Sequence, residues 1–305
     1  MRRAIYFLLL LYGWNLNAQP FKLVKDINTS KWFYDDGGSV SRLAELNGYL
    51  YVSIFYPQYG KELWKIDKLN VNKEIVKDIY PGWMGSNTTE IFVYNDFLYF
   101  SANDGLGGEE LWKSDGTTQG TTLVKDIVPG SVGSLPHNYI VYNNTLFFVA
   151  NGELWKSDGT QQGTSLVKEI YPGAIQSNPA NFCIKDGILY FAAQDPQNGR
   201  ELWRTDGTAD STYMVTDIYP GLDNAGRPNS GAPGSIKNIN SYLVFGASDL
   251  AHGREVWRSD GTAAGTILLK DIKPGPASST QFHSSEVFSN KLYFSVTVDN
   301  RKSVV

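Results

Sequence analysis

The stretch ELWKSDGTTQGTTLVKDIVPG, residues 110–130, decides how this chain folds. Its tryptophan context recurs 43 to 54 residues apart, at Trp64, Trp112, Trp155, Trp203 and Trp257. Asp-Gly-Thr follows four of these tryptophans, and a run close to Lys-Asp-Ile, then Pro-Gly, follows all five. A period of this length is typical of propellers and solenoids, in which each repeat is one structural unit.

A hairpin signal precedes each tryptophan. In residues 93–100, two apolar and aromatic runs flank the polar pair Asn95-Asp96, which is a typical turn between antiparallel strands. Each unit is therefore predicted to hold four antiparallel strands, a, b, c and d, with Glu-Leu-Trp on c and Lys-Asp-Ile on d. No stretch shows a sustained helical period, so the chain is predicted to be all-β.

A four-stranded sheet alone leaves two apolar faces and two edges uncovered, and packing such sheets in a ring covers the faces. We predict a β-propeller of about six four-stranded blades, with an open β solenoid or a fragment of a larger propeller as the alternative. The predicted units are a lone d strand at 21–27, blades at about 39–79, 90–127, 138–170, 181–218 and 235–272, and a partial blade at 283–305.

The two ends of the repeat array suggest a closure of the ring. The lone strand at 21–27 and the last hairpin, at 287–294, could together complete one shared blade. That blade lacks a Glu-Leu-Trp strand, so either residues 301–305 form a degenerate c strand or the chain is cut short after Val305. We favour the second interpretation.

The recurrent string Glu-Leu-Trp-Lys-Ser-Asp-Gly-Thr resembles the ELWxxDGT repeat family of bacterial secreted and surface proteins. The resemblance runs from Phe21 to about Phe294, and it implies an extracellular protein, often with a C-terminal sorting domain, and no known activity. Two units depart from the pattern, because residues 66–69 read Ile-Asp-Lys-Leu and residues 210–212 read Asp-Ser-Thr.

The N-terminus has the pattern of a secretory signal peptide. Arg2 and Arg3 precede a short apolar run, and a cleavage point after Ala18 leaves a single repeat domain at 19–305. We expect a secreted, extracellular or cell-surface protein that does not span a membrane. Cleavage would take the formal net charge from −4 to −6, which argues against nucleic acid as a partner.

Residues suited to chemistry are few. The three histidines lie in unrelated contexts and Cys183 lies in an apolar strand pattern, so we expect no catalytic residues, no metal site and no cofactor, and lean against an enzyme. A calcium site at the Asp-Gly-Thr turns is the alternative, but each turn offers one aspartate. We assign a structural turn role to these aspartates, which are Asp115, Asp158, Asp206 and Asp260. The glutamate before each tryptophan is expected to pair with the lysine of strand d.

The b–c and d–a connections vary most between repeats and open on one face, which favours that face for partner binding. One d–a connection is longer than the others, through an insertion at residues 222–234. Candidate partner-binding residues are Trp83, Tyr171, Tyr219, Asp223, Asn224, Arg227 and Asn229. We expect a secreted scaffold for binding or adhesion, without catalysis, whose partner is a glycan or an extracellular protein. The alternative is a carbohydrate-active enzyme with carboxylates at the ring axis.

Overall fold

The computed structural model describes residues 43–304, apart from 71, 174, 290 and 299–300. Within that part the secondary structure consists of β-strands and turns, with no helix. The strands are β1 (Ala44–Leu46), β2 (Tyr49–Tyr56), β3 (Gly60–Asp67), β4 (Lys73–Lys77), β5 (Thr89–Tyr94), β6 (Phe97–Asn103), β7 (Glu109–Ser114), β8 (Thr122–Lys125), β9 (His137–Tyr142), β10 (Thr145–Ala150), β11 (Glu153–Ser157), β12 (Ser165–Lys168), β13 (Ala180–Lys185), β14 (Ile188–Asp195), β15 (Gly199–Thr205), β16 (Tyr213–Thr216), β17 (Gly234–Ile239), β18 (Tyr242–Asp249), β19 (Gly253–Ser259), β20 (Ile267–Lys270), β21 (Thr280–Phe288), β22 (Lys291–Val298) and β23 (Arg301–Val304).

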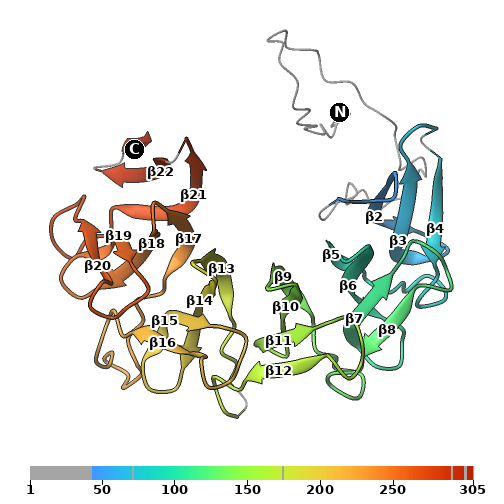
Figure 1. The fold of residues 1–305 in the computed structure, drawn as a ribbon, viewed down its shortest axis with the longest axis horizontal. Coiled ribbons are helices and arrows are strands. Elements are labelled where there is room, and N and C mark those ends of the chain that lie inside the picture. Colours follow the sequence, from blue (N-terminus) through green and yellow to red (C-terminus); the bar gives the residue numbers. More distant parts are fainter. Residues whose placement is uncertain (1–42, 71, 174, 290, 299–300, 305) are drawn as a thin grey trace, which may run out of the picture.

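The strands form successive antiparallel sheets in chain order. Each of the first five sheets has four strands, from β1–β4 to β17–β20, and the sixth has three, β21–β23. The sheets follow one another along an arc, with the first and sixth at its two ends (Figure 1). The first strands of neighbouring sheets contact each other on the inner side of the arc, and the fourth strands lie outside.

The a–b hairpins close as the polar pairs predicted. Asn95 and Asp96 have φ of 46° and 58°, and Asn143 and Asn144 have 46° and 52°. Two successive residues in the left-handed region form the turn type whose twist matches that of paired strands. Asparagine and aspartate tolerate this region better than other side chains, so the sequence sets the strand ends locally.

The hydrophobic core lies between the sheets. Each of the clusters at the sheet-to-sheet interfaces combines residues of two consecutive sheets, as when Tyr51 and Leu63 of the first pack with Phe100 of the second. Phe100, Phe148, Phe191 and Phe245 occupy the same place on strand b of successive sheets and are fully buried. Burying each of these rings contributes about 1.5–3 kcal/mol, so the sheets hold one another in the arc.

The prediction of an all-β fold of four-stranded antiparallel sheets is confirmed. Arg301–Val304 pairs with β22 as the third strand of the sixth sheet, in the position suggested for a degenerate c strand. The lone strand predicted at 21–27 and the signal peptide at 1–18 lie outside the described residues.

Candidate functional site

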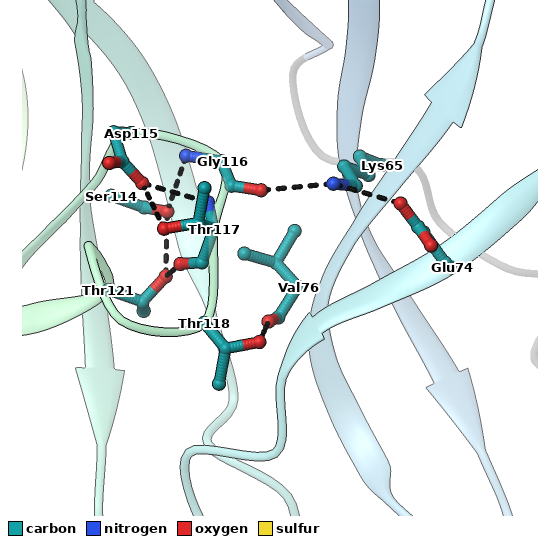
Figure 2. Close-up of polar contacts among 9 residues, drawn as sticks. All are labelled: Lys65, Glu74, Val76, Ser114, Asp115, Gly116, Thr117, Thr118 and Thr121. Carbon is teal, nitrogen blue, oxygen red and sulfur yellow. Dashed lines mark hydrogen bonds and ion pairs between the residues drawn. The ribbon is translucent and has the colours of Figure 1, made fainter.

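The Asp-Gly-Thr turn of the second sheet is tied both to itself and to the first sheet (Figure 2). Within the turn, Asp115 Oδ1 accepts hydrogen bonds from the backbone N–H and the hydroxyl of Thr117, both within 2.8 Å. These bonds to Thr117 keep the pKa of Asp115 below its usual value. Across the interface, Lys65 Nζ donates to the Gly116 carbonyl at 3.2 Å. Asp115 therefore has its acceptor capacity occupied by its own turn, as a structural residue does.

A second lysine of the repeat, on strand d, makes contacts of the same kind between neighbouring sheets. These contacts correct one expectation. The lysine of Lys-Asp-Ile does not pair with the glutamate of its own sheet but donates to a carbonyl of the next sheet's turn. The bonds are Lys77 to Thr121 O at 2.7 Å, Lys125 to Thr164 O at 2.7 Å and Lys168 to Thr212 O at 2.6 Å. Sequence reasoning missed this role because the acceptor is a backbone carbonyl of another repeat.

The glutamate before each tryptophan is buried and binds the d–a loop of its own sheet. Glu62 accepts bonds from the backbone N–H groups of Tyr80 and Ser86 and from the Ser86 hydroxyl. Burial still raises the pKa of this carboxyl, because the low-dielectric surroundings disfavour its charged form. The expected glutamate–lysine pairs are therefore wrong, and the carboxylate instead holds a surface loop in place.

The described part of the chain contains no group of three or more histidine, cysteine, aspartate or glutamate side chains arranged to hold a metal ion. Among the same residues no helix is long and apolar enough to cross a membrane.

The predicted partner-binding residues lie on d–a loops of different sheets and do not converge. Trp83 lies on a loop of the first sheet, where most of its side chain is exposed, and Tyr171 lies on a loop of the third. Tyr219 and the four insertion residues, Asp223, Asn224, Arg227 and Asn229, belong to the fourth. The Asp223 carboxylate accepts from Arg227 Nε at 2.9 Å, and Asn229 Nδ2 donates to Pro220 O at 3.2 Å, so these four residues bond mainly within their own loop.

A cavity of about 200 Å³ opens in the second sheet, on the same face. Asp104 and Leu106 of the b–c loop, Trp112 of β7 and Asp126 after β8 line it, together with Gly107, Gly108, Glu110, Leu123 and Gly130. The sequence did not single out Asp104 or Asp126 as candidates. The signal that could have found the site is the loop Asp-Gly-Leu-Gly-Gly at 104–108, which is poor in side chains.

The glycines of loop 104–108 explain why the second sheet has a cavity beside Trp112. In the first sheet the rings of Tyr56 and Tyr59 lie 4.4 Å and 6.1 Å from the ring of Trp64, measured between centroids, and cover it. Counting back from the shared glutamate, Gly107 stands where the first sheet has Tyr59. With no side chain at that position, the equivalent tryptophan, Trp112, lines a cavity, while 7% of it is exposed, the same fraction as for Trp64.

The repeat position of Asp126 is half-buried in three sheets and exposed in the second and third, where Asp126 and Glu169 stand. Asp78, Asp217 and Asp271 occupy this position in other sheets, and each has a buried carboxylate oxygen without a hydrogen-bond partner. Asp126 is exposed and faces the cavity. The second sheet thus has two carboxylates and an indole ring lining a place that Tyr59 fills in the first sheet.

The charge around the cavity is mainly negative. Burial raises the pKa of Glu110, whose carboxylate already accepts bonds from Ile127 N, Val128 N and the Ser134 hydroxyl. Lys77 Nζ lies 5.8 Å from the Trp112 ring centroid but is held by the Thr121 carbonyl. Asp104 Oδ1 accepts from the backbone N–H groups of Leu106 at 2.8 Å and Gly107 at 3.0 Å, so the acceptors that the cavity offers are Asp104 Oδ2 and the carboxylate of Asp126.

Comparison with solved structures identifies the fold as a β-propeller. The chain is similar to a prolyl endopeptidase, with TM-score 0.51, 10% identity, and coverage of 88% of this chain and 41% of that one. A puromycin hydrolase matches with TM-score 0.47, 11% identity and coverage of 84% and 42%, and TolB from Acinetobacter baumannii with TM-score 0.38, 10% identity and coverage of 73% and 53%. The chain thus spans about two fifths of the length of the two hydrolases. No family model and no curated protein matches the sequence.

These findings correct the functional expectation. The prolyl endopeptidase shares the propeller fold with this chain, and nothing in the comparisons supports an adhesion scaffold without catalysis or a carbohydrate-active enzyme. The expectation was drawn from the variable loops and from the few residues suited to chemistry, while the side chains of the repeat residues bind turns and neighbouring sheets. Such residues report the architecture, while function resides in sites that one fold carries in many forms.

Proposed function

We propose that this chain is a propeller domain that binds a basic side chain of a polypeptide in the cavity of the second sheet. The observation that carries the proposal is the placement of Asp104 and Asp126 beside the indole of Trp112. An ammonium or guanidinium group gains from charge-assisted hydrogen bonds to carboxylates and from the face of an aromatic ring.

The size of the cavity supports a side chain as the occupant. Its volume of about 200 Å³ is below the range of roughly 300–1,000 Å³ that whole small-molecule ligands occupy. A polypeptide ligand also agrees with the shared fold of a prolyl endopeptidase, although that likeness concerns the fold alone.

Calorimetric titration of the protein with Nα-acetyl-lysine amide and Nα-acetyl-arginine amide tests the proposal. We expect weak binding that Asp126→Asn reduces about tenfold or more, because a hydrogen bond to a charged group contributes about 1.5–3 kcal/mol. Nα-acetyl-norleucine amide has no charge and should not bind. Asp96→Asn, the same charge change on an exposed turn of the same sheet, is the matched control. Equal binding of the neutral and charged amides would rule the proposal out.

A second variant closes the cavity without touching either aspartate. A Cβ at Gly107 meets only Asp104 Oδ1, at 4.0 Å, so a side chain can be added there. In Gly107→Tyr the new ring should cover Trp112 as Tyr59 covers Trp64, abolishing binding while the melting temperature stays at or above that of the wild type. Gly107→Ala adds one methyl group and should still bind. Undiminished binding by Gly107→Tyr would place the ligand elsewhere.

We also propose that the protein is exported and belongs with the ELWxxDGT repeat proteins. The pattern at 1–18 and the five-fold recurrence of the Glu-Leu-Trp unit, once as Glu-Val-Trp, support these two proposals. Expression in a bacterial host with N-terminal sequencing of the exported fraction tests the first. A mature chain that begins near Gln19 is the expected result, and a chain that stays inside the cell with Met1 retained would contradict it.

A further inference from the structure

The loops on both sides of the cavity expose large apolar side chains. The exposed fractions are 72% for Trp83 and 55% for Met84 on loop 78–88, 83% for Leu106 on loop 104–108, and 79% for Val132 and 54% for Leu135 on loop 126–136. Side chains of this kind seldom cluster on a free surface, and where they do they mark a surface that contacts a partner.

Direct contacts bring these three loops together. The Tyr80 ring of loop 78–88 lies against Gly105, where an added Cβ would come within 2.8 Å of it, and Asn103 N donates to Ser86 O at 2.9 Å. On the other side, Ser134 N donates to Glu109 O at 2.9 Å. Loop 104–108 is therefore held between the other two loops, so loops with exposed apolar side chains flank the acidic cavity on both sides.

We infer that the partner segment carries large apolar residues on both sides of the basic residue that enters the cavity. The inference rests on the proposed function and specifies its ligand. The basic group would pair with Asp104 and Asp126, while the flanking residues would cover Leu106, Val132 and Trp83. A lipid surface fits less well, because the anionic head groups that attract proteins to membranes would be repelled by the two carboxylates.

The charge pattern decides between this partner and a purely apolar one. An apolar segment alone would leave the carboxylates of Asp104 and Asp126 facing it without partners, which costs free energy. A basic segment with polar flanks would satisfy the carboxylates but leave the apolar loops in water. Only a segment with a basic residue and apolar flanks both pairs with the carboxylates and covers the apolar loops.

Two peptides of equal charge test the inference on the whole protein. Acetyl-Leu-Leu-Lys-Leu-Leu-amide should bind at least tenfold more tightly than acetyl-Ser-Ser-Lys-Ser-Ser-amide, measured by fluorescence anisotropy with labelled peptides. Replacing the central lysine by norleucine in the first peptide should weaken its binding by a similar factor. If the two lysine peptides bind equally, the inference is wrong while the proposed function stands, and if neither binds, the proposed function fails.

Surface variants locate the flanking contacts. Val132→Ser and Trp83→Ala should weaken the leucine peptide several-fold and leave the serine peptide unchanged, because neither residue lines the cavity. Leu250→Ser changes an equally exposed leucine on the fifth sheet and should affect neither peptide. An equal loss from Leu250→Ser, or co-sedimentation with phosphatidylserine vesicles that Val132→Ser abolishes, would overturn the inference.

Discussion

The fourth and fifth sheets bury the same glutamate in two different ways. Glu255 of the fifth sheet accepts bonds from Ile272 N, Ser279 N and the Ser279 hydroxyl. Glu201 of the fourth sheet accepts bonds from the backbone of Ile218, Gly231 and Tyr219, and no serine hydroxyl is among these partners. The insertion at 222–234 has thus replaced a side chain with a closer approach of the backbone.

The difference shows that the repeat specifies a buried glutamate. The loop that covers this glutamate sets the pKa of its carboxyl. Burial raises the pKa of Glu201 to about 8, and the bonds from Gly231 and Ile218 oppose that shift without cancelling it. With a pKa of about 8, the Glu201 carboxyl keeps its proton at neutral pH in the folded protein. Three predictions test this comparison.

The largest expected effect is on stability when the glutamate is removed. Glu255→Ala should lower the free energy of unfolding by about 3–5 kcal/mol, because it leaves three donors without an acceptor in a buried site. Glu201→Ala strands backbone donors alone and removes a carboxyl that is protonated over much of the pH range, so it should cost about 1–3 kcal/mol. Urea denaturation followed by tryptophan fluorescence measures both, and an equal or larger loss in Glu201→Ala would contradict the comparison.

A smaller effect should appear in the pH dependence of stability. Between the usual glutamate pKa of 4.5 and about 8, the folded protein keeps a proton on Glu201 that the unfolded chain has released. Stability from this group is therefore present below pH 4.5 and is lost as the pH rises through about 8. Over this interval wild type should lose about 2–4 kcal/mol relative to Glu201→Gln, which cannot ionise.

The control for this measurement is Glu286→Gln, which changes an exposed glutamate. Its unfolding free energy should run parallel to that of the wild type across the same pH range. Parallel curves for Glu201→Gln and wild type would show that Glu201 ionises normally in the folded protein.

The smallest effect concerns the backbone that replaced the serine. A Cβ at Gly231 would lie 2.7 Å from both Ile218 Cβ and Glu201 Oε2, so Gly231→Ala should destabilise the protein by about 1–3 kcal/mol through crowding. Ser279→Ala in the fifth sheet loses one hydroxyl bond and should cost about 1 kcal/mol. Thermal unfolding shows which of the two variants loses more stability. If Gly231→Ala is as stable as the wild type, the backbone of the insertion can move away from Glu201.

Much of the fold could be predicted because its signals are local. The pair Asn95-Asp96 marks a turn by its own conformational preference, and the alternation around Phe100 marks a strand with two covered faces. The role of Asp115 is equally local, since its partner is two residues away. Such features need no knowledge of the neighbouring sheet.

The candidate site could not be predicted in the same way. Asp104 and Asp126 are separated by two strands in sequence, and their relation to Trp112 depends on how three segments pack around the missing side chain at Gly107. The partner of Lys77 was missed for a similar reason, because Thr121 belongs to another repeat and contributes a backbone carbonyl that every residue type possesses.

The sequence by itself determined the repeat, the strands and the turns, because short-range preferences of asparagine, aspartate and glycine act within a few residues. Only the tertiary structure decided which tryptophan borders a cavity and which buried glutamate holds its proton. Those properties depend on the packing and dielectric surroundings that distant segments create, and identical motifs such as Glu-Leu-Trp therefore differ from sheet to sheet.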